Sequence, residues 1–402
     1  MNNWTSARLA DITSKIGSGA TPLGGEQAYK DQGIALIRSL NVHDGEFRWR
    51  DLAFLDQGQA DRLNNVSVER GDVLLNITGA SIARCCVVPD EALPARVNQH
   101  VSILRARKDV VLPQFLQYQL IAPDTKANLI DVGEGAGSTR QALTKAQLQA
   151  ILIQLPASLG EQHRIVTILD EAFEGIATAK AHAEQNLRNA KSLITTRLAQ
   201  LFRPDGDMVR LADLAISISD GDHAPPPKAS AGVPFITISN INKESRQIDF
   251  SETFLVSQAY FDELKTHRRP QPGDVLYTVT GSFGIPVLIE EDRAFCFQRH
   301  IGLVRPKPDV DGKWLSYALL SPMAFAQADA GATGTAQRTV SLNVLRNMQM
   351  PKLSIEEQRY QAKGLDALAA EVARLASIYQ RKLTALTELQ QSLLHQAFTG
   401  QL

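Results

Sequence analysis

The sequence is short of cysteine, of aromatic residues and of net charge. Its 402 residues include three cysteines and 6% aromatic residues, and the formal net charge is −1. Cys85 and Cys86 are adjacent and Cys296 stands alone, so they form neither a disulfide framework nor the CxxC pairs of a zinc site. We interpret all three as apolar strand residues.

Long apolar runs are also missing. The opening residues, MNNWTSARLADI, lack the basic region and apolar run of a secretory signal, and no stretch reaches the roughly 18 apolar residues of a membrane span. We therefore expect a cytoplasmic protein without a membrane partner. The composition, 44% hydrophobic and 21% charged, is that of a folded chain long enough for two domains of about 100 to 200 residues each.

The usual catalytic and cofactor motifs are absent from the sequence. GEGAGSTR at 133–140 lacks the lysine of a phosphate-binding loop, and IGSGATP has Pro22 where a dinucleotide fingerprint needs its third glycine. There is no HExxH, no zinc-spaced cysteine set and no GxSxG. We expect a non-catalytic chain that binds no metal and no cofactor itself.

What the sequence does contain is a duplication. GDVLLNITG at 71–79 recurs as GDVLYTVTG at 273–281, and RLAD at 8–11 recurs at 210–213 with the same offset of 202 residues. Such self-similarity predicts two copies of one structural unit.

Further strings match in the same order along both halves. VNQHVSILRA from Val97 resembles FQRHIGLVRP from Phe297, and this match aligns His100 with His300. A Gly/Thr-rich segment ending in a basic residue follows at 133–140 in the first half and at 331–338 in the second.

Each half closes with one long predicted helix, 161–202 and 357–398. SLGE before the first and SIEE before the second are capping boxes, in which a serine and a glutamate satisfy free backbone amides at the helix start. Apolar residues then recur at spacings of three and four, which is typical of a helix buried along one narrow stripe against another helix.

Small seam residues of the first helix align with large ones of the second. In an antiparallel coiled coil with the helix centres opposed, Ala179 would lie near Tyr379 and Ala183 near Leu375, so that large residues meet small ones.

Between these signals, short β-rich runs alternate with Gly/Pro turns and helical stretches. The expected fold class is α/β, with two tandem-repeated mixed α/β domains separated by two long antiparallel helices that form a coiled coil. The expected boundaries are domain 1 at 1–155, helix 1 at 156–203, a linker at 204–208, domain 2 at 209–350 and helix 2 at 351–402.

Together these features resemble the specificity subunit of type I restriction–modification systems. LPASLGEQHRIV and MPKLSIEEQRYQ resemble that family's proline-then-EQ entry to its conserved helices, and GDVL…TG and the Gly/Thr-rich segment precede each helix in the same order. The resemblance covers essentially the whole chain.

The resemblance implies a non-catalytic DNA-binding chain. Each domain would be a target-recognition domain for one half of a bipartite sequence in double-stranded DNA, and the coiled coil would set the unread spacer. Two modification (methyltransferase) subunits would supply S-adenosylmethionine for adenine methylation. Restriction (endonuclease and translocase) subunits would use ATP and Mg²⁺ for cleavage.

Candidate DNA contacts are polar residues in corresponding loops, since base edges are read by Arg, Asn, Gln, Ser or Thr and phosphates by N–H groups and positive charge. In the first domain these are Thr21, Arg38, Asn41, Thr78, Ser81, Arg84, Gln99, His100, Thr139 and Arg140. In the second they are His223, Thr237, Asn240, Thr280, Ser282, Gln298, Arg299, Gln337 and Arg338, together with Arg268 and Arg269 as a phosphate patch.

Two other classes of function fit the same pattern. The chain could be a coiled-coil protein-binding scaffold with two peptide-binding domains, or an enzyme whose site is too dispersed to recognise from sequence. A two-part DNA motif with an indifferent middle is expected of the DNA-binding function alone.

Overall fold

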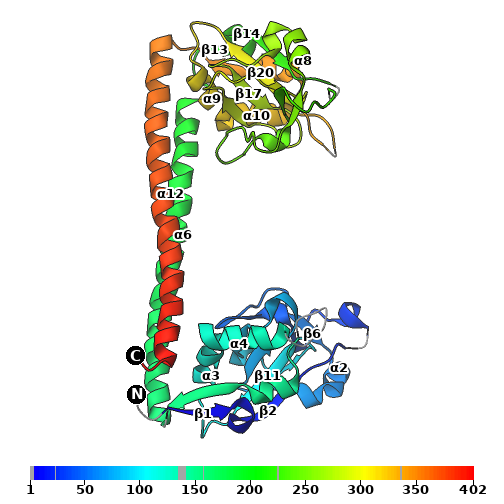
Figure 1. The fold of residues 1–402 in the computed structure, drawn as a ribbon, viewed down its shortest axis with the longest axis vertical. Helices are drawn as coiled ribbons and strands as arrows, with labels where there is room; N and C mark the ends of the chain where they lie inside the picture. Colours follow the sequence, from blue (N-terminus) through cyan, green and yellow to red (C-terminus); the bar gives the residue numbers. More distant parts are fainter. Residues whose placement is uncertain (1–3, 23, 135–141, 157, 224–225, 336) are drawn as a thin grey trace. The chain divides into compact units, whose positions relative to one another are not determined.

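The computed structural model describes residues 4–402 except 23, 135–141, 157, 224–225 and 336. Its contacts divide the chain into two compact units, one formed by residues 1–183 with 381–402 and the other by 184–380. Each unit holds one mixed α/β domain and half of each of two long helices, α6 and α12 (Figure 1). The predicted fold class is thereby confirmed.

The first domain contains two four-stranded sheets. The sheet β2–β11–β8–β9 is antiparallel throughout, whereas β6–β3–β10–β7 contains the parallel pair β3/β10. The strands are β1 Trp4–Arg8, β2 Thr13–Ser18, β3 Ile34–Ile37, β4 Val42–His43, β5 Glu46–Phe47, β6 Ala53–Leu55, β7 Ser67–Val68, β8 Val73–Asn76, β9 Cys85–Val87, β10 Ala95–Val97, β11 Val101–Ala106 and β12 Leu152–Pro156. The helices are α1 Leu9–Ile12, α2 Gln57–Arg62, α3 Pro113–Ile121, α4 Pro123–Glu134 and α5 Lys145–Ala150.

The second domain repeats this plan with fewer strands. The sheet β14–β20–β17–β18 corresponds to β2–β11–β8–β9, and β16–β15–β19 keeps the parallel pair as β15/β19. The strands are β13 Met208–Arg210, β14 Ala215–Asp220, β15 Val233–Ile236, β16 Phe254–Val256, β17 Val275–Thr278, β18 Pro286–Leu288, β19 Cys296–Phe297, β20 Ile301–Pro306 and β21 Gln349–Pro351. The helices are α7 Leu211–Leu214, α8 Gln258–Glu263, α9 Gly312–Leu320, α10 Pro322–Gly331 and α11 Leu342–Asn347.

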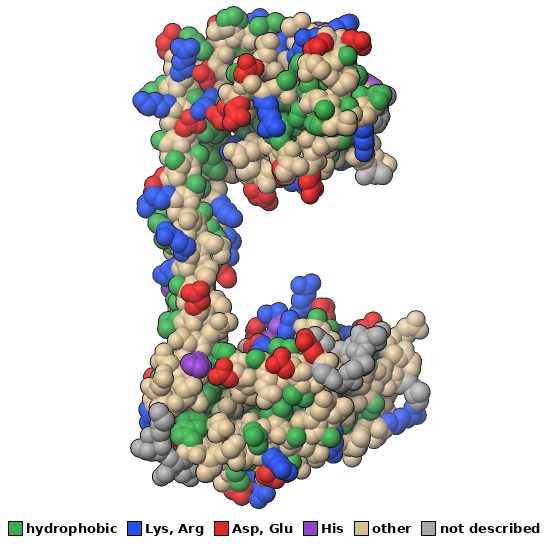
Figure 2. All heavy atoms as spheres, in the orientation of Figure 1, with side chains coloured by type: hydrophobic (Ala, Val, Ile, Leu, Met, Phe, Trp, Pro, Cys, Tyr) green, Lys and Arg blue, Asp and Glu red, His purple; other side chains and the backbone are tan. Residues whose placement is uncertain are grey.

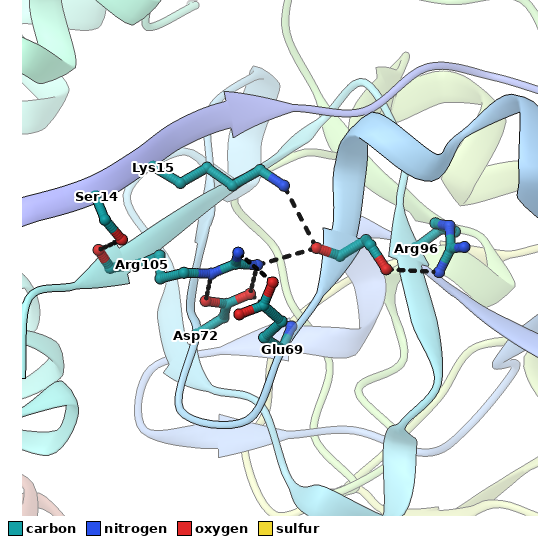
Figure 3. Close-up of polar contacts among 7 residues, drawn as sticks. Ser14, Lys15, Glu69, Asp72, Arg96 and Arg105 are labelled. Carbon is teal, nitrogen blue, oxygen red and sulfur yellow. Dashed lines mark hydrogen bonds and ion pairs between the residues drawn. The ribbon is translucent and has the colours of Figure 1, made fainter.

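The duplicated GDVL string forms the same internal strand in both domains, β8 and β17, and all residues of both strands are buried. Its aspartate, Asp72 in the first copy, caps the turn before the strand by accepting from the Glu69 amide at 2.7 Å. The same carboxylate forms a two-pronged ion pair with Arg105 of β11, at 2.8 and 2.9 Å (Figure 3). The string is therefore explained by the architecture of the sheet.

The second copy has the same device. Asp274 accepts from the Gln271 amide at 2.9 Å and pairs with Arg305 of β20 at 2.7 Å. Both aspartate side chains are almost fully buried, with exposed fractions of 1% and 3%. A buried carboxylate is tolerated because the guanidinium and a backbone amide satisfy it.

The long helices are α6 Leu159–Leu201 and α12 Ile355–Phe398, which begin two residues earlier than expected. Before α12 the capping box is complete, because Ser354 and Glu357 each accept from the other's backbone amide. Before α6 only the serine half forms, and the Glu161 carboxylate binds Arg164 instead. At about 1.5 Å per residue each helix is roughly 65 Å long.

The two helices run antiparallel in both units. In the first unit, Ile165 and Leu169 of α6 share a core with Leu394 and Ala397 of α12. In the second, Leu198 and Phe202 of α6 share one with Ala362 and Leu365.

The expected register of the helix pair is wrong. It would place Lys180 beside Ile378, whereas the Lys180 ammonium donates to the side chain of Gln390 at 3.0 Å, which lies too far along α12 for the two side chains to meet in that register. A repeating seam that contains several alanines offers several registers of similar burial, so the seam alone does not select among them.

A buried glutamine fastens each helix to its domain. Gln162 of α6 accepts from the Leu112 amide at 2.9 Å and donates to the Val110 carbonyl at 3.0 Å, just before α3. Gln358 of α12 accepts from the Asp311 amide at 2.8 Å, just before α9. Both are 1% exposed, and they are the glutamines of the two EQ strings. The EQ signature is therefore a docking contact.

Candidate nucleic-acid interface

Each domain presents a tight turn where a short strand meets a long one. Residues 98–101 join β10 to β11, and residues 298–301 join β19 to β20; we name these the duplicated turns. The first amide of each turn, at residue 98 or 298, donates to the carbonyl of the last residue of β3 or β15. The amide of residue 101 or 301 then donates to the carbonyl of residue 98 or 298 and closes the turn. The His100 carbonyl accepts from Ile77, and the His300 carbonyl accepts from Val279. The backbones of the two turns are therefore fastened alike.

A glycine lies against each duplicated turn. A Cβ atom added to Gly19 would be 1.6 Å from the Val97 carbonyl oxygen, and one added to Gly221 would be 1.9 Å from that of Phe297. No larger residue fits without moving the backbone. These glycines let the segment that leaves β2 or β14 cross directly over the turn, so that its polar residues reach the residues of the turn.

Four predicted residues of the first domain form a continuous hydrogen-bonded chain. The Thr21 hydroxyl donates to Gln99 Oε1 at 2.6 Å, Gln99 Nε2 lies 2.9 Å from His100 Nε2, and His100 Nδ1 lies 2.6 Å from the Thr78 hydroxyl. Because an amide nitrogen carries only donor hydrogens, His100 Nε2 is the acceptor and Nδ1 carries the proton. Gln99 is exposed but held in one orientation.

The second domain places different side chains on the same turn. Arg299 corresponds to Gln99 and is exposed, and within the described part of the chain its guanidinium makes no hydrogen bond or salt bridge. Burial, and then the positive charge of Arg299, lower the pKa of His300. His300 is therefore a neutral imidazole at pH 7, and Gln298 beside it is half-buried.

The described residues that follow the Gly/Thr-rich segments pair with the loops after β8 and β17. Thr78 bridges to Ala142 in the first domain, and Thr280 bridges to Thr339 in the second. The candidates Thr139 and Arg140 lie outside the described residues.

In the second domain two exposed candidates, Ser282 and Gln337, lie on these adjoining loops. Arg338 on the same loop binds both the carboxylate and the carbonyl of Asp329 and lies over the Phe283 ring. Thr280 is 6% exposed, which leaves little of it for a ligand.

Two predicted contacts are buried in the domain. Asn41 is 0% exposed and Asn240 is 6% exposed. Each amide oxygen caps the 3₁₀ turn that follows β3 or β15, and each amide nitrogen donates to backbone carbonyls of the next loop. Their hydrogen-bonding groups are consumed inside the domain, so we assign both residues to holding the loop.

Three predicted arginines are also engaged within the protein. Arg38 donates to the Asp51 carbonyl at 2.5 Å and lies over the Tyr29 ring. Arg268 donates to the carbonyl of Asp220, the last residue of β14, at 3.0 Å and to the Asp222 carboxylate at 3.2 Å, and Arg269 donates to the Leu264 carbonyl at 2.9 Å. Most guanidinium donors of the expected phosphate patch at 268–269 therefore have partners within the domain.

The remaining candidates lie near the same loops and form fewer hydrogen bonds within the domain. Ser81 and Arg84 are half-buried after β8, and the Ser81 hydroxyl donates to the Thr78 carbonyl at 3.5 Å. His223 is exposed and lies 2.9 Å from the Asp220 carboxylate. The Thr237 hydroxyl is shared with Ser239 and Asn240.

The duplicated turn of the first domain borders a hollow of about 270 Å³. Thr21, Arg38, Gln99 and His100 line it, which brings together four of the predicted residues. Leu40, 40% exposed, and Glu26 line it too and were missed by the sequence analysis. No motif marks them, since they reach the hollow only through the fold of the loops.

Charge does not mark out one binding face by itself. Lys, Arg, Asp and Glu side chains are interspersed over the visible surface of each unit (Figure 2). Among the described residues, no group of three or more His, Cys, Asp or Glu is placed to hold a metal ion. In the part of the chain that the structure describes, no helix is both long and apolar enough to cross a membrane.

Comparison with known families gives a specific match. Residues 1–187 match the family described as "Type I restriction modification DNA specificity domain". Two specificity subunits from Escherichia coli are similar along the chain. The EcoBI subunit is 24% identical over 77% of this chain and 70% of its own length, and the EcoKI subunit is 23% identical over 99% and 89%.

Solved structures share the fold. A chain from a type I R-M system, studied for its complex assembly and conformational transition, aligns with a TM-score of 0.76 at 20% identity over 100% of this chain and 99% of that one. The HsdS subunit from Thermoanaerobacter tengcongensis aligns with a TM-score of 0.62, also at 20% identity, over 100% and 98%. Both alignments span the duplication and both long helices.

Proposed function

This chain is a specificity subunit of the type I restriction–modification class, and on that premise we propose that it reads a bipartite DNA sequence, one half-site per domain. The observation that carries the proposal is the pair of duplicated turns, which share three backbone bonds but bear Gln99 in one domain and Arg299 in the other. One scaffold with different exposed donors is what two readers of different half-sites require.

The helix pair supports the second part of the proposal, a spacer of fixed length. Each domain is fastened to its helix by a buried glutamine and also by a tyrosine. Tyr118 donates to Asp170 at 2.5 Å, and Tyr317 donates to Asp366 at 2.8 Å. Because each helix is attached to its domain by these contacts, the length of the helices would fix the number of base pairs between the half-sites. Those base pairs would not be read.

Chemistry is assigned to partner subunits. Two modification subunits would bring S-adenosylmethionine for adenine methylation, and restriction subunits would bring ATP and Mg²⁺ for cleavage. The chain itself would be non-catalytic and would act in the cytoplasm by positioning these subunits on double-stranded DNA.

Sequence selection tests the proposal. The chain, assembled with its modification subunits, is incubated with duplexes that carry a randomised region, and the bound duplexes are sequenced. The expected result is two short specific segments separated by an indifferent segment of constant length. A contiguous motif would contradict the bipartite proposal. Absence of any motif, with peptides bound instead, would favour the coiled-coil scaffold with two peptide-binding domains.

A further inference from the structure

The two duplicated turns differ at one informative position. Gln99 and Arg299 are each the second residue of a turn that the same three backbone bonds hold to the neighbouring strands and close in both domains. Resting on the proposed function, we propose that these residues are specificity determinants, with Gln99 reading an adenine in the first half-site and Arg299 reading a guanine in the second.

Gln99 has the geometry that adenine recognition needs. An adenine edge in the major groove offers the N7 acceptor and the N6 donor, and a glutamine amide satisfies both when its two ends are correctly oriented. Thr21 takes one lone pair of Oε1 and His100 takes one hydrogen of Nε2, which leaves one lone pair and one hydrogen for a base. His100 is thus a positioning residue, because its ring contacts the Gln99 amide nitrogen at 2.9 Å and fixes the plane of the amide.

Arg299 suits guanine for the complementary reason. Guanine presents two acceptors, O6 and N7, and a guanidinium donates to both at once. The Arg299 side chain is exposed and, among the described residues, unpaired, so its fork of donors is available. Arg38, Arg268 and Arg338 differ in this respect, since each already binds a carbonyl of its own domain.

Exchanging the two side chains tests the assignment. Gln99→Arg and Arg299→Gln are made separately in the full chain, each is assembled with modification subunits, and the bound duplexes are sequenced from a randomised pool. Gln99→Arg is expected to change one adenine of the first half-site to guanine and to leave the second half-site unchanged. Arg299→Gln is expected to change one guanine of the second half-site to adenine. Preference at the altered base pair should shift by roughly five- to 150-fold.

Matched controls separate reading from charge. Gln57→Arg adds the same charge to an exposed position on α2 of the first domain and should leave the motif unchanged. His100→Ala should weaken the adenine preference at the Gln99 base pair alone. The double variant Gln99→Arg/His100→Ala should still select guanine, because an arginine fork needs no partner to orient it.

The outcomes are distinguishable from failure of the proposed function. If the unmodified chain selects a two-part motif but both exchange variants keep that motif, the assignment of Gln99 and Arg299 is overturned and the bipartite function stands. If the unmodified chain selects no two-part motif, the proposed function fails first. A change in both half-sites from either single variant would also overturn the assignment.

Discussion

At the scale of single residues, most of the repeated sequence pattern is structural. The aspartates of the two GDVL strings are buried in ion pairs with Arg105 and Arg305, and the glutamines of the two EQ strings are buried in docking contacts. The residues most suited to reading DNA, Gln99 and Arg299, occupy positions where the two copies differ. Under the proposed function, the shared positions would build the fold and the differing positions would carry specificity.

Removal of the first buried carboxylate should destabilise the protein. Asp72→Ala leaves Arg105 short of its main partner inside the sheet, and we expect a loss of about 3 kcal/mol in the free energy of unfolding. Thermal unfolding measures the change. The control Asp61→Ala, at an exposed position on α2, should cost less than about 0.5 kcal/mol. Equal midpoints for the two variants would show that the ion pair adds nothing.

The three cysteines should be unreactive in the folded protein. All are buried, and burial raises the pKa of both Cys86 and Cys296 to about 12. Since the thiolate is the nucleophile, a pKa of about 12 leaves roughly one thiol in ten thousand reactive at pH 8. Mass spectrometry after iodoacetamide treatment should find three modified cysteines in denaturant and none in buffer. Rapid modification of Cys86 in buffer would contradict the buried position.

At the scale of elements, the sequence predicted the ends of the long helices better than it predicted how the helices pair. The capping serines and the apolar period placed both long helices to within two residues, because each helix start is set by its own side chains. The register between the helices was missed, because it is set by long-range contacts such as Lys180 with Gln390. The buried caps Asn41 and Asn240 were likewise taken for DNA contacts, since an asparagine has the same donors in either role.

Lengthening both helices should lengthen the unread spacer. Seven residues, two helical turns that keep the seam in phase, are inserted directly after Lys180 in α6 and directly before Gln390 in α12, whose side chains meet across the helix pair. The added length is about 10 Å, or roughly three base pairs. Sequencing of selected duplexes should show both half-sites preserved and a gap longer by about three.

A matched insertion in one helix alone provides the control. Seven residues added only to α6 break the match between the helices, so binding should weaken rather than acquire a longer gap. An unchanged gap in the double-insertion complex, with DNA still bound, would refute the role of the helices as a spacer.

At the scale of the whole molecule, each domain is completed by both helices. The end of α6 packs on the second domain, where Phe202 lies 5.9 Å from the Trp314 ring, and the end of α12 packs on the first, where Phe398 lies 5.3 Å from Phe115. The duplication in the sequence therefore predicts two equivalent units, but it does not reveal that each unit is assembled from distant segments. That arrangement depends on which hydrophobic surfaces meet after both helices have formed.

The candidate site was predictable only in part for the same reason. Thr21, Thr78, Gln99 and His100 were each predicted as DNA contacts, and the structure brings them from three loops into one hydrogen-bonded chain. Leu40 could not be foreseen beside them, and the engagement of Arg268 and Arg269 with nearby backbone was equally hidden in the sequence. The sequence indicates which side chains could contact DNA, and the geometry of the loops decides which of them keep free hydrogen-bonding groups.

The most direct test of independent reading is an exchange of one domain. Residues 209–350 are replaced by the corresponding domain of a relative with a different target, and the methylated sites produced by the assembled complex are mapped. If each domain reads its own half-site, the second half-site changes to that of the relative while the first half-site and the gap persist. A complex that methylates DNA with both half-sites altered, or with neither altered, would contradict two independent readers.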